Sequence, residues 1–484
     1  MNGRKEGEEE DRERAPKIIG SGLELFDGVE KNHKMIIKGK MGNVSVCFVF
    51  LFLIARVGFA EDVVFNLRDA ISTALENNNE LRAFESSVSA EKADVGISRS
   101  YLLPQINLEE AFVRTNNPTG VFSIKLNEGR FKESDFEISS LNNPDPVSDF
   151  ETDISVEQPV LAVQEALALK SAKKEYLAKR EEYGRQREYV AFRVVETYVQ
   201  VGTAKEFVEV ARKALEDANE QLRIANSRFK SGMGIYSDTL RAETAVTEAE
   251  QQLVSTEKNL KVAKRSLGLL LGLDESVDTE AVTEEIELRE FDYYAEKSLS
   301  RKDVASLQHR YESAKTNVSI ADAGYLPRIG VRGTYQLNDR DVPFGSEGDS
   351  WFVAAFLRWE IFNGGRREYE RARASHTASQ IEESLEGMKK SVSLSVYDSY
   401  LAVEEAKKNV ELAEKSLETA AEGTRLVRKR YENSLSPFYD LLDSQLNLDR
   451  ARANLVSKRN GCLVSVARLS FESGTILDDL GITD

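Results

Sequence analysis

Residues 190–229 read VAFRVVETYVQVGTAKEFVEVARKALEDANEQLRIANSRF, and residues 392–431 read VSLSVYDSYLAVEEAKKNVELAEKSLETAAEGTRLVRKRY. In the first stretch, apolar or small residues recur at alternating steps of four and three: Val190, Val194, Thr197, Val201, Ala204, Val208, Ala211, Leu215, Ala218, Leu222, Ala225 and Phe229. The second stretch follows the same steps, and eight of the twelve residues are identical. A mean step of 3.5 residues held for this length predicts a coiled-coil seam, and its recurrence predicts a duplicated chain.

The two seams predict two long helical hairpins. If residues 164–230 form one helix, its length is about 100 Å at 1.5 Å per residue. The break after it, Ser231-Gly-Met-Gly234, is short, so the next helix must return antiparallel. A second seam runs from Thr239 to Leu270 and recurs in the second half of the chain, where Cys462 replaces a leucine. We interpret Cys462 as a buried apolar side chain and not as a reactive thiol.

Four segments between the helices change their period from 3.5 to 2, which is typical of β-strands: 105–115, 150–157, 328–337 and 351–361. The first alternates less cleanly because Glu110 interrupts its apolar face. Trp351 and Trp359 are expected to face one way, near the ends of the fourth segment. Apolar faces of this length with aromatic ends indicate transmembrane strands, so we expect both tryptophans in an aromatic girdle against outer-membrane lipid. For any one strand alone, a half-buried soluble sheet is the alternative.

Four strands cannot close a barrel, and an open edge in lipid leaves backbone groups without partners. The predicted fold class is therefore an α+β membrane protein, with long antiparallel helical hairpins and four transmembrane strands per chain, closing as a trimer with twelve strands. The segment 92–106 matches 315–329 at an offset of 223 residues, whereas the two seams match at an offset of 202, so 223 − 202 = 21 extra residues lie in the first loop between strands, 116–146, which is expected to face outward. The expected divisions are an N-terminal extension with a signal peptide (1–60), a first repeat (61–270), an equatorial linker segment (271–300), a second repeat (301–471) and a C-terminal tail (472–484).

The N-terminus predicts export. An apolar run at 44–55 follows Lys38 and Lys40 and precedes small residues, which is the layout of a secretory signal peptide. Met1, Met35 and Met41 are alternative translation starts. The charged fraction of 30% and the mean hydropathy of −0.41 exclude a helical membrane protein, and the net charge of −17 excludes nucleic acid as a partner.

No catalytic constellation is visible in the exported part of the chain. It holds His309 and His376 far apart, the single cysteine Cys462, and no glycine loop that could cradle phosphate. We expect each histidine to be a surface or groove residue. The sequence therefore predicts a protein that is not an enzyme and has no cofactor and no bound metal.

Four motifs, in this order, resemble the TolC family of outer-membrane efflux channels. They are residues 69–78 (DAISTALENN), the Leu-Pro pairs at 103–104 and 326–327, residues 359–367 (WEIFNGGRR) and residues 430–445 (RYENSLSPFYDLLDSQ). The resemblance implies a trimer, with a barrel in the outer membrane and a twelve-helix tunnel through the periplasm. It implies the exit duct of a tripartite efflux or type I secretion system. The implied partners are a periplasmic adaptor and an inner-membrane pump of RND or ABC type, and the cargo (drug, metal ion or protein) stays open.

The resemblance also implies site residues. The two hairpin turns would form the periplasmic tip that docks the adaptor, through Gly232, Met233, Gly234, Ser434, Leu435, Ser436 and Pro437. Asp440 and Asp443 match an acidic ring that narrows the tunnel mouth, and Asp238 and Tyr431 match neighbouring gate positions. Since Asp440 and Asp443 are separated by only two residues, they share a helix face, and three copies would gather six carboxylates that repel anions and concentrate cations.

The second turn departs from the family pattern at three positions. Ser434 stands where the family has glycine, Ser436 stands where it has an arginine that latches the closed mouth, and Pro437 is an addition. The first strand-to-helix junction, 158–163, also lacks the Gly-Gly-Arg pattern of the second. Two other protein classes are alternatives. A periplasmic coiled-coil scaffold or adaptor would leave the strands unexplained, and a secreted pore-forming toxin would leave the matching halves unexplained.

Overall fold

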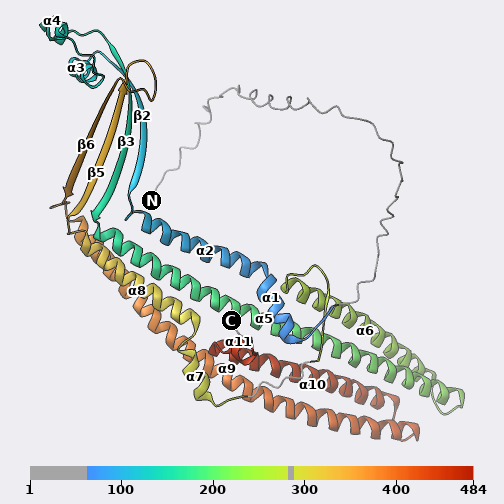
Figure 1. Ribbon diagram of the computed structural model, residues 1–484. Coiled ribbons are helices and arrows are strands. Elements are labelled where there is room, and N and C mark those ends of the chain that lie inside the picture. The colour runs from blue at the N-terminus through green and yellow to red at the C-terminus, as the bar shows by residue number, and fades with distance from the viewer. Residues whose placement is uncertain (1–62, 282–287, 483–484) are drawn as a thin grey trace, which may run out of the picture. The chain divides into compact units, whose positions relative to one another are not determined.

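Two long helical hairpins dominate the protein in the computed structural model, which describes residues 63–281 and 288–482 (Figure 1). In the first, α5 (Val163–Lys230) turns into α6 (Tyr236–Leu270), and in the second, α9 (Arg366–Glu432) turns into α10 (Phe438–Ser473). The 68 residues of α5 extend for about 102 Å at 1.5 Å per residue. Both predicted hairpins are confirmed, whereas the extension and signal peptide expected at 1–60 lie outside the described residues.

The predicted seams are the buried faces of these helices. The buried seam residues are Val190, Val194, Val201, Val208, Ala211, Ala218 and Ala225 in α5, and Val392, Val396, Ser399, Val403, Ala413, Thr424 and Tyr431 in α9. Each buried valine stabilises the fold by about 1.5 kcal/mol or more relative to an exposed one. The frequent alanines let the helix backbones approach closely. Within the described ranges, every helix is too short or too polar to cross a membrane.

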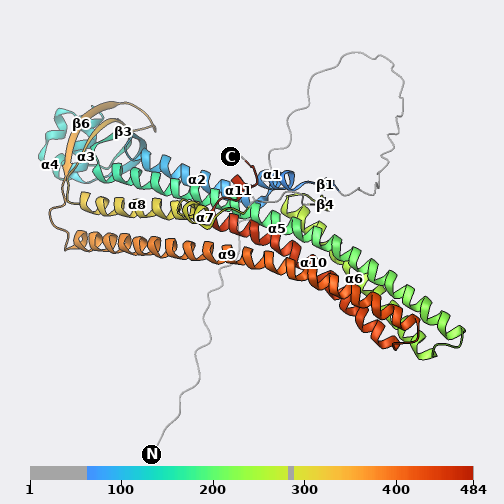
Figure 2. The same cartoon turned by 90° about the horizontal axis from the view of Figure 1, so that it is seen from below.

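Each long helix has two partners that follow one another along it. The strand end of α5 packs against α2 (Asn79–Ser100), and its other end packs against α6. In the same way, α9 packs first against α8 (Lys302–Ala323) and then against α10 (Figure 2). The two halves also pack on each other, because α5 contacts both α8 and α10. As a result, four helices run side by side over most of the length of the hairpins.

A four-stranded antiparallel sheet continues from the α2, α5, α8 and α9 ends (Figure 1). Its strands are β2 (Gln105–Thr115), β3 (Val147–Leu161), β5 (Arg328–Asp339) and β6 (Gly348–Arg358), in the order β2-β3-β5-β6. A strand is present at each of the four predicted places, but β3 is longer at both ends than the predicted 150–157, and β6 begins three residues before the predicted 351. The extension of β3 includes a register shift between Pro159 and Leu161, because proline cannot donate to the ladder.

The prediction that the fourth strand reaches residue 361 is wrong. The strand β6 ends at Arg358, so Trp359 and Ile361 lie beyond it. The indole nitrogen of Trp359 donates to the carbonyl oxygen of Tyr325 at 3.1 Å. Gly364 and Gly365 then adopt φ values of 70° and 81°, and the chain enters α9. The strand ends early because this junction turns the backbone away from the sheet.

The long connection between β2 and β3, predicted as an outward loop at 116–146, contains three short helices. They are α3 (Pro118–Asn127), the 3-10 helix η1 (Glu133–Phe136) and α4 (Ile138–Asn142). Val121, Ile124 and Val147 form a small buried cluster beneath them. Figure 1 shows α3 and α4 at the end of the strands that is remote from the long helices.

Short elements surround the middle of the hairpins. The strand β1 (Val63–Phe65) pairs in parallel with β4 (Val277–Thr279), and residues of α1 (Leu67–Asn77) and α11 (Ile476–Asp479) share a core cluster with this pair. The helix α7 (Phe291–Ser298) packs against α9 and α10 instead. The largest core cluster joins α1 to the middle of α5 and to the ends of α6 and α10. Tyr198 is fully buried there, and its hydroxyl donates to the carbonyl oxygens of Phe65 and Glu280.

Cys462 differs from its prediction. Its side chain is half-buried and not fully buried. Burial raises the pKa of the thiol, while the nearby Lys407 on α9 lowers it to a smaller extent. Cys462 therefore borders the contact between α9 and α10 beside a lysine that must reach water, and it does not fill that contact.

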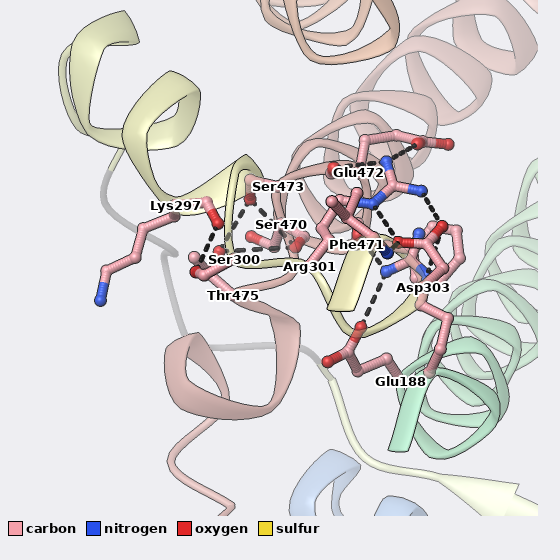
Figure 3. Close-up of polar contacts among 12 residues, drawn as sticks. Glu188, Lys297, Ser300, Arg301, Asp303, Ser470, Phe471, Glu472, Ser473 and Thr475 are labelled. Carbon is pink, nitrogen blue, oxygen red and sulfur yellow. Dashed lines mark hydrogen bonds and ion pairs between the residues drawn. The ribbon is translucent and has the colours of Figure 1, made fainter. Parts of the chain in front are cut away.

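A charged cluster fixes the start of α8 to the end of α10 (Figure 3). The buried guanidinium of Arg301 donates to the carbonyl oxygen and the carboxylate of Glu472, at 2.9 and 3.1 Å, and to both carboxylate oxygens of Asp303. Beside it, Arg185 stacks 3.7 Å from the ring centroid of Phe471. Burial alone would raise the pKa of Asp303, but the hydrogen bond and the charge of Arg301 outweigh it, so this pKa is lowered.

Substituting Asp303→Asn should lower the free energy of unfolding by about 2 kcal/mol at pH 7, because Arg301 loses its bidentate partner. The folded pKa of Asp303 lies below the ordinary 3.8. Its contribution is therefore present above about pH 4 and is lost as the pH falls through the folded pKa. Guanidinium unfolding in detergent, followed by helical circular dichroism, should show wild type and variant converging at low pH.

The control for this prediction is Asp322→Asn. Asp322 pairs with Arg371 at 2.6 Å, but both side chains are about half exposed, so the change should have little effect on stability at any pH. Equal losses in the two variants would contradict the role given to the buried cluster.

Candidate functional site

The two hairpin turns have the same backbone structure. In the first turn, the amide of Gly232 donates a hydrogen bond to the carbonyl oxygen of Phe229 at 3.0 Å. The amide of Met233 donates one to the carbonyl oxygen of Arg228 at 2.9 Å. In the second, Ser434 and Leu435 make the corresponding bonds to Tyr431 and Arg430, at 3.0 and 2.8 Å. This is the Schellman pattern that ends a helix with one left-handed residue.

Ser434 shows what the missing glycine changes. It occupies the left-handed position with φ of 61°, where Gly232 has 74° in the first turn. A serine in this region carries steric strain that glycine does not. Its hydroxyl oxygen accepts a hydrogen bond from Nη2 of Arg228 at 2.9 Å. The departure from the family pattern thus supplies an acceptor that glycine lacks.

The side chain of Arg228 joins the two turns. Its Nη1 donates to the carbonyl oxygens of Tyr431 and Glu432, at 2.7 and 2.9 Å, and its Nη2 also donates to that of Met233 at 3.1 Å. The carbonyls of Tyr431 and Glu432 belong to the last turn of α9, where a cation is favoured by the helix dipole. The tip therefore consists of both turns held as one unit.

The structure places the four predicted gate residues in two groups. Tyr431 is 3% exposed, between the hairpins, and its pKa is raised by burial and further by the charge of Asp238. Asp440 and Asp443 are exposed on α10. Ser436 donates its hydroxyl hydrogen to Asp440 at 2.7 Å, and Asp443 borders a groove of about 510 Å³ that is lined by α5, α6 and α10. Within one chain, Tyr431 and Asp238 lie together, and the two aspartates lie on the open surface.

The remaining turn residues point mostly to solvent. Met233 and Leu435 are 64% and 68% exposed. Gly234 lies in a tight place, since a Cβ there would approach the Cβ of Arg228 and the amide nitrogen of Phe229 at 3.1 Å. Pro437 precedes the first residue of α10 and acts as its N-cap. The predicted docking residues thus form a compact end surface.

The sheet has one apolar and one polar face. On the apolar face, Leu108, Ile154, Tyr335 and Trp351 are consecutive cross-strand neighbours, and Ile106, Val156 and Val353 lie beside them. On the other face, Glu109, Asp153, Gln336 and Ser350 are neighbours in the same way. The apolar face is open to the surroundings, with Ile106 and Trp351 each 73% exposed. Large exposed apolar patches of this kind mark sites that interact with a membrane or with another protein.

Trp351 lies near the start of β6, and Trp359 follows the last residue of that strand. Eight steps along the chain separate Trp351 from Trp359, which corresponds to about 26 Å at ~3.3 Å per residue. Both are exposed, at 73% and 55%. Glu110, which interrupts the apolar face of β2, is not left without partners. Its carboxylate accepts hydrogen bonds from the Thr152 hydroxyl and the Phe344 amide.

The family model of outer membrane efflux proteins matches residues 70–273 and 294–475. The chain belongs to this family. Among its relatives, the alkaline protease secretion protein AprF of Pseudomonas aeruginosa is 24% identical over 442 residues, or 89% of this chain and 88% of AprF. The outer membrane protein TolC of Vibrio cholerae is 23% identical over 442 residues, or 88% and 95% of the two chains.

The fold agrees with this assignment. The crystal structure of the outer membrane protein VceC from Vibrio cholerae matches with a TM-score of 0.71 at 16% identity, covering 84% of this chain and 96% of that one. The efflux protein is thus an outer-membrane exit duct with a helical periplasmic extension, as predicted. The alternatives of a coiled-coil adaptor and a pore-forming toxin are wrong, because neither class accounts for a family match that covers both halves.

Sequence reasoning on this efflux protein missed the polar contacts between its hairpins. No local pattern distinguishes Arg228 from the other charged residues of its helix. Asp217, which is buried, accepts hydrogen bonds from Gln445 and Arg452 of α10 at 3.0 and 2.8 Å. These partners come from opposite halves of the chain. The duplication was the one available signal, because it predicts that the two turns lie side by side.

Proposed function

We propose that three copies of this chain form one continuous duct, in which twelve strands close a barrel and twelve helices enclose a tunnel. The observation that carries the proposal is the two-faced sheet. Its apolar face is exposed, and in the described chain β2 and β6 each have one edge without a strand partner. Lipid would cover the apolar face, and the edges would pair between copies.

The helices support the same stoichiometry. Each copy supplies four helices at each level, first α2, α5, α8 and α9, and then α6, α5, α10 and α9. Three copies therefore give twelve helices along the whole tunnel. In this arrangement residues 61–270 and 301–471 act as two repeats, and residues 271–300 act as the equatorial segment between them.

The turns at the end of the tunnel are the proposed docking surface for a periplasmic adaptor, which would connect the duct to an inner-membrane pump of RND or ABC type. They are the part of the hairpins farthest from the sheet (Figure 1). Asp440 and Asp443 would form the acidic ring at the mouth. The duct would be a passive conduit, and the energy for transport would come from the pump. AprF is named for protease secretion, and the family is named for efflux, so both kinds of cargo stay open.

The two tryptophans provide a direct test, because they are the only tryptophans in the sequence. In single-tryptophan variants, Trp351→Phe and Trp359→Phe, the remaining indole should be quenched strongly by lipids brominated near the headgroup. Lipids brominated deep in the acyl chain should quench it less, since girdle residues lie at the interface.

The matched control moves a tryptophan to the opposite side of the sheet. Replacing Gln336 with tryptophan in the Trp351→Phe, Trp359→Phe background should give fluorescence that no brominated lipid quenches. Equal quenching at positions 336 and 351, or none at 351 and 359, would overturn the lipid-facing assignment.

A further inference from the structure

Each hairpin turn carries an aromatic pair at the same repeat position. In the second turn, the rings of Tyr431 and Phe438 are 5.3 Å apart, and in the first, those of Phe229 and Tyr236 are 5.5 Å apart. The two pairs differ in their cover. Tyr431 and Phe438 are 3% and 1% exposed, whereas Phe229 and Tyr236 are 43% and 57% exposed. The aromatic pair of the first turn, Phe229 and Tyr236, is thus exposed, whereas the equivalent pair of the second turn is buried.

The first hairpin supplies the cover of the second pair. Ala225 and Ala242 pack with Tyr431 and Phe438 in one cluster. Above the ring of Tyr431 lies the guanidinium of Arg228, 4.7 Å from the ring centroid, with its hydrogen bonds to the carbonyls of Tyr431 and Glu432. A guanidinium at this distance combines a cation–π contact with charge-assisted hydrogen bonds.

Arg430 is the counterpart of Arg228, because it occupies the same position in the second repeat. It donates to the carbonyl of Leu435 at 3.4 Å, as Arg228 donates to that of Met233. Its side chain is exposed, and among the described residues it contacts no carbonyl of the other hairpin. The carbonyl of Phe229 accepts the amide of Gly232, just as that of Tyr431 accepts the amide of Ser434. Both repeats therefore contain the arginine and the turn with its carbonyls. Within one chain, however, only Arg228 bonds the carbonyls of the other hairpin, and Arg430 does not.

We propose that Arg430 binds the first turn of the next copy of this chain, and there makes the contacts that Arg228 makes within one chain. Its guanidinium would lie over Phe229 of the neighbouring copy and donate to the carbonyls of Phe229 and Lys230. The inference rests on the proposed closed trimer, in which six hairpins alternate around the axis. Around the axis, the first hairpin of each copy contacts the second hairpin of the same copy. That second hairpin in turn contacts the first hairpin of the next copy.

The repeat also predicts how the two contacts differ. Arg228 has the hydroxyl of Ser434 as a fourth acceptor, and the corresponding residue for Arg430 is Gly232, which has no side chain. The contact between copies therefore has one hydrogen bond fewer than the contact within a copy. Arg430 is a positioning residue of the assembled tip and not a residue that contacts cargo.

Cross-linking with a short bismaleimide tests the proposal, with Cys462→Ser as background so that the mature chain has no other cysteine. The test pair is Lys230→Cys with Arg430→Cys. The matched pair is Arg228→Cys with Glu432→Cys. In the duplicated chain, Arg228 is the equivalent of Arg430 and Glu432 is the equivalent of Lys230. On denaturing gels, the test pair should give covalent dimers and trimers. The matched pair should give only cross-linked monomer, because its partners lie in one chain.

The outcomes separate this inference from the proposed function. A wild-type protein that is monomeric in detergent contradicts the trimer itself. A trimer in which the matched pair reacts and the test pair forms no link between chains contradicts only the role of Arg430. Cross-linked monomer from the test pair also contradicts it, since the contact would then lie within one chain.

Hydrogen exchange gives a second readout in the full trimer. Arg430→Ala should accelerate exchange of the first-turn amides, Gly232, Met233 and Gly234, about tenfold, as expected when a charge-assisted contact is lost. Arg228→Ala should accelerate the second-turn amides instead. Arg430→Lys keeps the charge without the planar fork, so it should recover only part of the protection. Acceleration confined to the second turn in Arg430→Ala would overturn the proposal.

Discussion

Replacing Met233 and Leu435 with glutamate should reduce export more than tenfold, while the trimer and its place in the outer membrane stay unchanged. Both side chains are more than 60% exposed at the apices of the two turns, and neither has a left-handed backbone. A charge placed in an apolar docking surface costs at least about 2 kcal/mol, which is roughly a thirtyfold loss of affinity. The measurement is export by cells that supply the pump and adaptor.

This substitution is chosen over changes at Gly232 and Ser434, because those positions have φ of 74° and 61° and a bulky residue at Gly232 would strain the turn itself. The matched control is Ile138→Glu, in α4 beyond the far end of the strands, where the side chain is 77% exposed. The control should export normally. Wild-type export by the Met233→Glu, Leu435→Glu variant would show that the turns are ordinary solvated loops.

The double variant Asp440→Ala, Asp443→Ala should lose cation selectivity in planar bilayers, with block by multivalent cations from the periplasmic side weakened about tenfold or more. Both carboxylates are exposed on one face of α10 in its first two turns. Threefold symmetry would gather six of them around one axis, and a ring of like charges at a constriction concentrates cations. Single-channel recording measures both quantities on the same channels.

The control is Glu383→Ala, Glu386→Ala on α9. These two exposed carboxylates have the same spacing along the helix, but they lie far from the turns. Their removal should leave block unchanged. If the aspartate variant also keeps wild-type selectivity and block, Asp440 and Asp443 serve only to solvate a helix.

The helices could be predicted from sequence because their signal is local and repeated. The expected helix at 164–230 matches α5 to within one residue at either end, and the repeated seam predicted the second long helix and its turn, which are α9 and the turn after it. The strand ends were less predictable. The end of β6 depends on the bond from Trp359 to Tyr325 and on two glycines with positive φ, and alternation of side chains does not report these.

The candidate site was predictable only in part. Tyr431 was assigned both to the seam and to the gate, and the structure places it in the seam, under Arg228. Other contacts join segments that are distant in sequence, so no local pattern predicts them. Examples are the pairing of β1 with β4 and the hydrogen bonds of Arg301. The gate and the docking turns rest on the family likeness, and they stay predictions.

The most direct test of the account is the mass of the mature chain after extraction from outer membranes. Light scattering combined with refractive index separates the mass of the protein from that of bound detergent. The account predicts a detergent-dependent particle containing three copies, since one copy presents an open apolar sheet with two unpaired edges. A monomer that stays in solution without detergent would contradict it.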